Sequence, residues 1–139
     1  IVTYWHFAAR LKGQGNWRSA FRMSDLLERL GMNADLPVLG YVFPKGWAAD
    51  HAELVRKFAK SIRQAKQDLV NNPQAWDRLR GLMRDPGEGE FEALRNGFLA
   101  GIPKPLDTAR IDDLHRLLEL TGSASENLMP ADLFFRSDQ

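Results

Sequence analysis

The sequence predicts an α/β fold that is dominated by helices and has few strands. After position 50 the apolar residues recur at helical spacing, whereas two short segments before it are rich in β-branched and aromatic residues. The two kinds of segment alternate along the first part of the chain, as they do in α/β proteins. The length of 139 residues and the 44% apolar composition are typical of one globular domain, so residues 1–139 are expected to form a single domain.

Two segments are predicted to be strands: residues 1–4, and residues 38–43 between Pro37 and Pro44. An isolated pair of strands is only marginally stable, so both segments need neighbours in a sheet. We expect these neighbours to come from preceding sequence or from a second copy of the chain. The chain begins inside an apolar run without an initiator methionine, so we expect it to be a partial domain, the C-terminal portion of a longer protein.

Six helices are predicted, over residues 6–11, 25–30, 54–69, 73–83, 91–99 and 111–118. The longest has the clearest apolar stripe, and Asp50 with Glu53 before it resembles a capping box. Ser24 is the expected N-cap of the second helix, and Asn72 followed by Pro73 is the expected start of the fourth. The tail from Ser123 is predicted to be mostly irregular.

The overall charge argues against nucleic acid as a partner. Lys and Arg number 19 and Asp and Glu number 18, so there is no excess positive potential to attract phosphates. The absence of cysteine excludes disulfides, thiolate metal sites and cysteine nucleophiles. No apolar stretch reaches the roughly 18 to 20 residues that a membrane-spanning helix needs.

No residue pattern predicts a metal site, a cofactor or a catalytic group. His6, His51 and His115 have no partner at a metal-binding spacing, and no serine lies in a nucleophile-elbow motif. The polar side of the longest helix carries five basic residues, Arg56, Lys57, Lys60, Arg63 and Lys66. A solvated helix face is the favoured interpretation, and a docking face for an acidic partner is the alternative.

Four consecutive aromatic side chains, Tyr4, Trp5, His6 and Phe7, lie where the first predicted strand ends and the first helix begins. Ligands bind at such junctions in α/β sheets, since the helix start offers free N–H groups to an anion. Tyr and Trp combine large apolar faces with one polar atom, which suits them to bind a planar solute. The alternative for Trp5 and Phe7 is that their rings pack between helix and sheet.

The chain resembles the substrate-binding proteins of nitrate/sulfonate/taurine-type ABC transporters, a group related to the thiamine-pyrimidine-precursor binding proteins. The resemblance covers most of the chain. It is carried by the order and spacing of residues 3–11, 24–27, 30–31, 39–43, 47–49 and the start of the helix at Leu54, Val55 and Phe58.

The resemblance implies a two-lobed periplasmic-binding-protein fold of type II, with the solute held in the cleft between the lobes. Residues 1–7 would be a crossing between the lobes and residues 8–139 a scaffold of lobe one. The ligand-binding role falls on Tyr4, Trp5 and His6, and in second place on Phe7 and Tyr41. The implied function is capture of a small anionic or planar solute for an ABC permease in the membrane. A periplasmic location, with a signal or lipid anchor upstream, follows from it.

Two alternatives remain beside a non-enzymatic receptor. A pyrimidine-synthase-like enzyme on the same fold would rely on His6. A helical protein-interaction module would use the basic face of the longest helix. Exposed strand edges further favour a homodimer or a domain swap of the chain.

Overall fold

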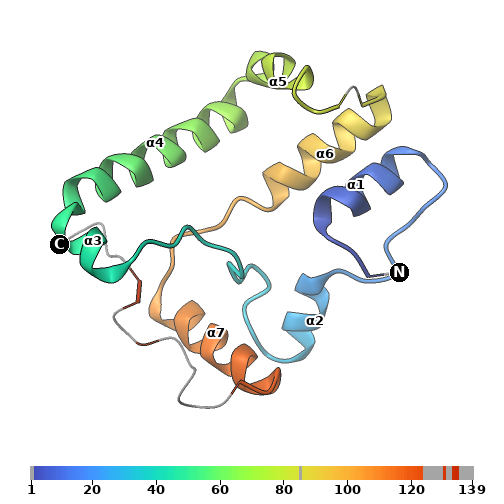
Figure 1. Ribbon diagram of the computed structural model, residues 1–139. Helices are drawn as coiled ribbons and strands as arrows, with labels where there is room; N and C mark the ends of the chain where they lie inside the picture. Colours follow the sequence, from blue (N-terminus) through green and yellow to red (C-terminus); the bar gives the residue numbers. More distant parts are fainter. Residues whose placement is uncertain (1, 85, 124–129, 131–132, 135–139) are drawn as a thin grey trace. The chain divides into compact units, whose positions relative to one another are not determined.

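The computed structural model describes residues 2–84, 86–123, 130, 133 and 134. Within this part the chain forms seven helices (Figure 1): α1 (Trp5–Gly13), α2 (Met23–Arg29), α3 (Lys45–Asp50), α4 (Ala52–Asn71), α5 (Pro73–Arg80), α6 (Glu88–Ala100) and α7 (Thr108–Leu120). None of these helices is both long and apolar enough to cross a membrane. Most of the tail after Ser123 lies outside the described residues.

All six predicted helices are present. The predicted N-cap of α5 is confirmed, because the Asn72 side chain accepts a hydrogen bond from the Gln74 backbone N–H at 3.1 Å and Pro73 opens the helix. Gly31, just beyond α2, has a φ of 70°, a left-handed conformation that favours glycine. α3 was missed because Pro44 and Gly46 indicate a turn rather than a helix.

Two capping predictions are wrong. α2 begins at Met23, so Ser24 lies inside the helix, where its hydroxyl donates to the Asp25 carboxylate at 3.4 Å. Asp50 is the last residue of α3 rather than the N-cap of α4, because the chain forms an additional helix directly before Ala52.

Both predicted strands are absent from the described part of the chain. Residues 2–4 lead into α1, with Tyr4 as its N-cap, and residues 38–43 belong to no helix or strand (Figure 1). Ile1 lies outside the described residues. The physical reason is that a strand exists only through hydrogen bonds to a neighbour, and the described residues supply none. The expected helical part of the fold is therefore confirmed, but the expected strands are not.

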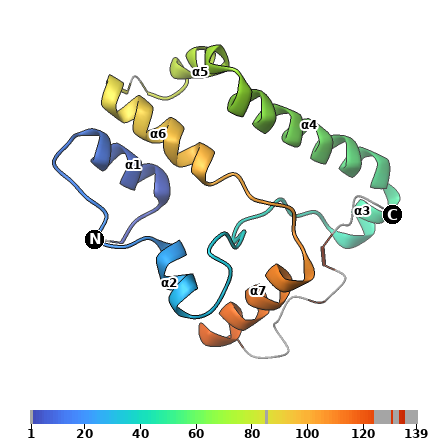
Figure 2. The same ribbon diagram turned by 180° about the vertical axis from the view of Figure 1, so that it is seen from behind.

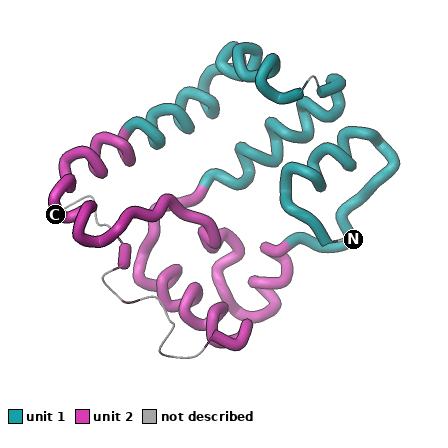
Figure 3. The backbone as a smooth tube through the Cα atoms, in the orientation of Figure 1, with its two compact units in different colours: residues 1–22, 61–102 teal, residues 23–60, 103–139 magenta. Residues whose placement is uncertain are grey.

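The chain divides into two compact units, which Figure 3 colours separately. Unit 1 comprises residues 1–22 and 61–102, and unit 2 comprises residues 23–60 and 103–139. α4 contributes its second half to unit 1 and its first half to unit 2.

In unit 1, α1 lies alongside α6, as both views show (Figures 1 and 2). Glycine makes the closest approach possible, since a Cβ built on Gly13 would lie 2.5 Å from the Glu90 Cα. The Arg10 guanidinium holds the two helices together. It contacts the Glu90 carboxylate at 2.9 Å and donates to the Met83 carbonyl at 2.8 Å. The buried apolar residues of this unit are Ala9, Ala75, Trp76, Phe91 and Leu94.

Unit 2 has its own small core, formed by Leu27, Met32, Leu36 and Leu114, with Leu117 and Phe134 packed against it. Polar contacts hold the loop after α2 to α7. The Asn33 backbone N–H donates to the Asp113 carboxylate at 2.8 Å, and the Arg110 guanidinium donates to both oxygens of Asp35 at 3.1 Å. These contacts place residues 33–36 against the beginning of α7.

Candidate functional site

The aromatic segment at the start of α1 is largely open to solvent. Tyr4 has an extended backbone, with a φ of −66° and a ψ of 152°, and its carbonyl accepts the N–H groups of Phe7 and Ala8 at 3.1 and 3.0 Å. The Tyr4 and His6 rings are nearly parallel, with centroids 6.0 Å apart. The Phe7 ring follows at 4.3 Å from His6. Tyr4, His6 and Phe7 therefore form a short row of rings at the helix start.

A shallow hollow lies beside this row. It has a volume of about 460 Å³ and is lined by Val2, Thr3, Tyr4 and Phe7. Tyr4 is 74% exposed and Phe7 52% exposed, so their ring faces are accessible to a solute. Two of the five predicted binding residues thus line a common hollow, and His6 contacts both of them.

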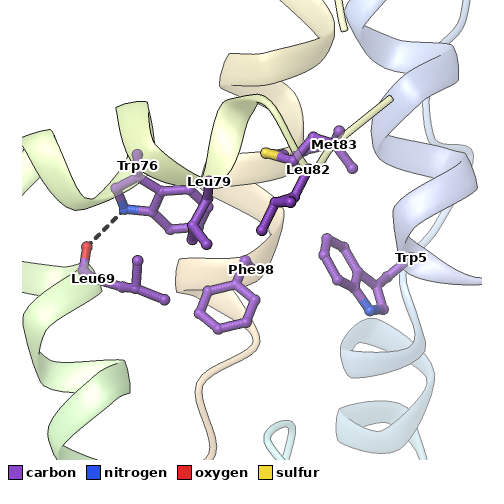
Figure 4. A pocket seen from close by; sticks show the side chains of 8 residues that line it. Trp5, Leu69, Trp76, Leu79, Leu82, Met83 and Phe98 are labelled. Carbon is purple, nitrogen blue, oxygen red and sulfur yellow. Dashed lines mark hydrogen bonds between the residues drawn. The ribbon is translucent and has the colours of Figure 1, made fainter. Parts of the chain in front are cut away.

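Trp5 has a different environment from its neighbours in the row. Its indole lies against Gly97 of α6, where an added Cβ would come within 3.2 Å of the Trp5 Cε3. It also lines an open apolar pocket of about 190 Å³ in unit 1 (Figure 4). The other lining residues are Leu69, Trp76, Leu79, Leu82, Met83, Leu94 and Phe98. Trp5 packs on α6 with part of its ring and is 49% exposed, so it has the contacts that the packing alternative expects, and its binding role stays a prediction.

Trp76, opposite Trp5 in Figure 4, has a structural role as well. Its indole N–H donates to the Leu69 carbonyl at 2.8 Å. In a continuous helix that carbonyl would accept the N–H of residue 73, but Pro73 has none. The Trp76 indole supplies the missing donor, so the α4–α5 junction keeps this carbonyl paired.

Tyr41 belongs to unit 2 and takes part in a separate group of rings. Its ring meets Phe58 edge-on at 5.0 Å, and Phe43 meets the same ring at 5.7 Å. Phe43 stacks on Trp47, which in turn stacks on His51 at 4.5 Å. Within its unit, Tyr41 is grouped with these residues. The structure therefore brings Tyr4, His6 and Phe7 together and places Tyr41 among other rings.

The electrostatics at the start of α1 are compatible with an anion. The first turn carries no acidic residue, and no side chain caps the helix, so the first N–H groups have no side-chain acceptor. The basic residues of α1, Arg10 and Lys12, lie in its last turn. An anion at the helix start would meet N–H donors and the positive end of the helix dipole without a competing carboxylate in that turn.

His51 contacts a carbonyl of its own helical turn, and the possible metal ligands among the described residues do not cluster. The His51 Nδ1 lies 2.9 Å from the Trp47 carbonyl, in a contact within one helical turn. Among the described residues, no three His, Cys, Asp or Glu side chains gather closely enough to hold a metal ion. The basic residues of α4 include Lys57, which pairs with Glu53 at 2.7 Å on the exposed surface.

A charged group in unit 2 was not predicted. Asp35 contacts Lys104 at 3.0 Å and Arg110 at 3.1 Å, and Asp107 contacts the same guanidinium. The hydrogen bond from Lys104, followed by that from Arg110, lowers the pKa of Asp35 below its ordinary value. Because Asp35 and Arg110 lie far apart in the sequence, no local pattern could have indicated the pair. The group holds the loop after α2 to α7.

Comparison of the chain with protein-family models, with curated proteins and with solved structures found no match in any of the three.

Proposed function

We propose that this chain is part of the solute-binding component of an ABC-type import system, in which it captures a small anionic or planar molecule. The observation that carries the proposal is the open row of Tyr4, His6 and Phe7 at the uncapped start of α1. Aromatic faces stack on a planar solute, while N–H groups at the helix start donate hydrogen bonds to its negatively charged group. Binding by this row needs no covalent chemistry.

The unpaired segment at residues 38–43 supports the fold that this function requires. Tyr41 and Phe43 both contact Phe58 of α4, whereas Val42 between them is 89% exposed. This alternation is the period of a strand that packs one face against a helix. A two-lobed α/β receptor of type II would use such a strand in the sheet beneath its helices. In the proposed protein the neighbouring strands, and the second wall of the cleft, come from polypeptide other than residues 1–139.

The proposed location is the periplasm, and the proposed macromolecular partner is the membrane permease. The proposed role is that of a receptor rather than an enzyme, since aromatic rings at a helix start suit stacking on a solute and hydrogen bonding to it. The sequence encoded upstream provides one check. The proposal expects a secretory signal or a lipid-anchor motif, followed by alternating strand and helix patterns.

The direct test is a calorimetric and thermal-shift screen of the full-length gene product against short sulfonates, nitrate and pyrimidines. The informative variants are Tyr4→Ala and Phe7→Ala, because both side chains are exposed and line the hollow. Trp5→Ala is unsuitable, since it also removes packing against α6. Trp17→Ala, at an aromatic residue that is 55% exposed elsewhere, is the control.

We expect Tyr4→Ala and Phe7→Ala each to weaken solute binding roughly tenfold. Each variant loses one stacking ring, and a tenfold rise in Kd corresponds to a loss of about 1.4 kcal/mol of binding free energy. Trp17→Ala should bind like the wild type. If every solute that binds the wild type binds Tyr4→Ala equally well, the row of Tyr4, His6 and Phe7 is not the binding site. If none of the three solute classes binds, the receptor function itself is contradicted.

A further inference from the structure

The His6 side chain contacts the rings of its three neighbours at the start of α1. Its imidazole is parallel to the Tyr4 ring within 5°, with 6.0 Å between the centroids, and the Phe7 ring lies 4.3 Å away. The Trp5 ring meets the imidazole edge-on at 5.8 Å. Within the described part of the chain, the His6 side chain makes these ring contacts but no hydrogen bond or ion pair. Its two ring nitrogens therefore have no partner among the described residues.

The row of rings accommodates a charged histidine as well as a neutral one. Histidine is the side chain that gains a positive charge as the pH falls from about 8 to about 5. Aromatic faces attract a cation within about 6 Å of the ring centroid, and the Tyr4 and Phe7 centroids lie 6.0 and 4.3 Å from that of His6. His6 is half-buried, so water reaches it. The charge of this site can therefore change in the mildly acidic range.

The charged groups that face this part of α1 are already paired with each other. Arg10 lies one turn beyond His6, and its guanidinium contacts the Glu90 carboxylate at 2.9 Å. Glu90 comes from α6, the helix that packs on α1, and also accepts a hydrogen bond from the Gln14 amide at 3.1 Å. The first turn of α1 contains no acidic residue. The Tyr4 phenol is the other titratable group that touches His6, and a phenol ionises only in alkaline solution. A positive charge on His6 is thus not neutralised by a carboxylate of the first turn or by Glu90.

We propose that His6 makes the capture of anionic solutes dependent on pH, with tighter binding when its imidazole is protonated. The inference rests on the proposed function, because it concerns the regulation of the same site. His6 does not line the hollow itself, but it touches Tyr4 and Phe7, which do. Its charge would lie roughly 4–8 Å from an anion in the hollow, a separation at which two unit charges in water change the affinity about two- to fivefold.

Solute binding and protonation of His6 are then coupled in both directions. A solute that binds better to the protonated protein must in turn promote the uptake of a proton. An uncharged solute lacks this attraction between ions, so its binding should not depend on the charge of His6. Anionic and uncharged solutes therefore give different pH profiles at the same site.

The test is calorimetric titration of the full-length gene product at about pH 5.5 and about pH 8, on either side of the range in which histidine titrates. Methanesulfonate and nitrate are the anionic probes, because both stay ionised at the two pH values, and uracil is the uncharged probe. Methanesulfonate and nitrate should bind about two- to fivefold more tightly at the lower pH. Uracil should bind equally at both.

His6→Gln removes the titratable charge and keeps a planar polar side chain, so the pH dependence of anion binding should disappear. His51→Gln is the matched control, because it removes an exposed histidine of unit 2 that stacks on Trp47. It should keep the pH dependence of the wild type. Circular dichroism checks that both variants retain their helices.

Proton uptake gives a second measurement that needs no variant. Titration of the wild type with methanesulfonate near pH 6.5, in two buffers of different ionisation enthalpy, should show uptake of a fraction of a proton. Uracil should show none. Absence of uptake with both anions contradicts the coupling to His6.

The inference and the receptor function fail in different ways. Equal anion affinity at both pH values, or a pH dependence in His6→Gln as large as in His51→Gln, overturns the role of His6. Binding that still depends on Tyr4 would then leave the receptor function in place. If neither anion binds at either pH, the role of His6 is overturned, and if uracil also fails to bind, the receptor function is contradicted as well.

Discussion

The Trp5 indole packs directly on Gly97, so that a Cβ at position 97 would lie 3.2 Å from Cε3 and 3.4 Å from Cζ3 of the ring. Gly97 lies in the interior of α6, where glycine costs about 1 kcal/mol relative to alanine. Glycine is present at position 97 because the Trp5 ring occupies the space that a side chain would need. This contact holds the start of α1, and hence the Tyr4–Phe7 row, against α6.

Replacing Gly97 by leucine should destabilise the protein. The new side chain meets the Trp5 ring, and overpacking of this kind costs about 1–3 kcal/mol in unfolding free energy. Urea denaturation followed by tryptophan fluorescence measures it. Gly46→Leu in α3 is the control, since nothing lies within 4 Å of a Cβ at that position. If the two variants have the same unfolding free energy, the packing of the Trp5 ring does not require glycine at position 97.

Gly13 and Gly89 should each be intolerant of alanine. A Cβ on Gly13 would lie 2.5 Å from the Glu90 Cα, and one on Gly89 would lie 2.6 Å from the Gly13 carbonyl oxygen. In both cases the added Cβ would clash with backbone atoms. The clash can be removed only if α1 and α6 move apart, which should lower the unfolding free energy by about 1–3 kcal/mol or more. Chemical denaturation gives the unfolding free energies.

Gly81→Ala serves as the control for these two variants, because a Cβ there meets nothing within 4 Å. The double variant of Gly13 and Gly89 should cost less than the sum of the single changes, because both separate the same pair of helices. Strict additivity would show that the two glycines do not share one contact.

The helices could be predicted from the sequence because their determinants are local. The apolar stripe of α4 and the Asn72-Pro73 start of α5 each lie within a few residues, and both were predicted correctly. α3 was missed because its six residues include Gly46 and show no periodicity. The 38–43 segment has strand propensity, but whether a strand forms depends on a distant neighbour that propensity does not specify.

The candidate site was predictable only in part, for the same reason. The position of Tyr4, His6 and Phe7 at a helix start follows from the local pattern, and the structure places these rings on the surface. The packing of Trp5 depends on Gly97, more than ninety positions away, which no local pattern reveals. The ion pair between Asp35 and Arg110 was missed because it too is formed by tertiary packing.

Trp76→Phe should destabilise unit 1 even though the ring is largely retained. The indole N–H is the donor to the Leu69 carbonyl at 2.8 Å, and Trp76 is only 4% exposed. The change leaves that carbonyl without its donor and removes part of a buried ring, at about 1–3 kcal/mol. Trp17→Phe, at an exposed indole, should change the unfolding free energy by less than about 0.5 kcal/mol. Equal effects of the two variants would contradict the role of the Trp76 hydrogen bond.

The contacts of Asp35 should make folding sensitive to acid. Hydrogen bonds from Lys104 and then from Arg110 lower the pKa of Asp35 in the folded protein below its value of about 3.9 in the unfolded chain. A carboxyl group with a depressed folded pKa binds protons more tightly when the chain is unfolded. Its stabilising contribution is therefore complete above about pH 4 and is lost as the pH falls through the folded pKa.

Asp35→Asn should consequently flatten the fall in unfolding free energy below about pH 4, measured by urea denaturation at a series of pH values. Asp112→Asn controls for the loss of one negative charge, because the exposed side chain of that α7 residue makes no hydrogen bond or ion pair with the described residues. Arg110→Met should flatten the same part of the profile as Asp35→Asn, since it removes one of the donors that lower the pKa. If Asp35→Asn and Asp112→Asn have identical acid profiles, the contacts of Asp35 with Lys104 and Arg110 do not stabilise the fold.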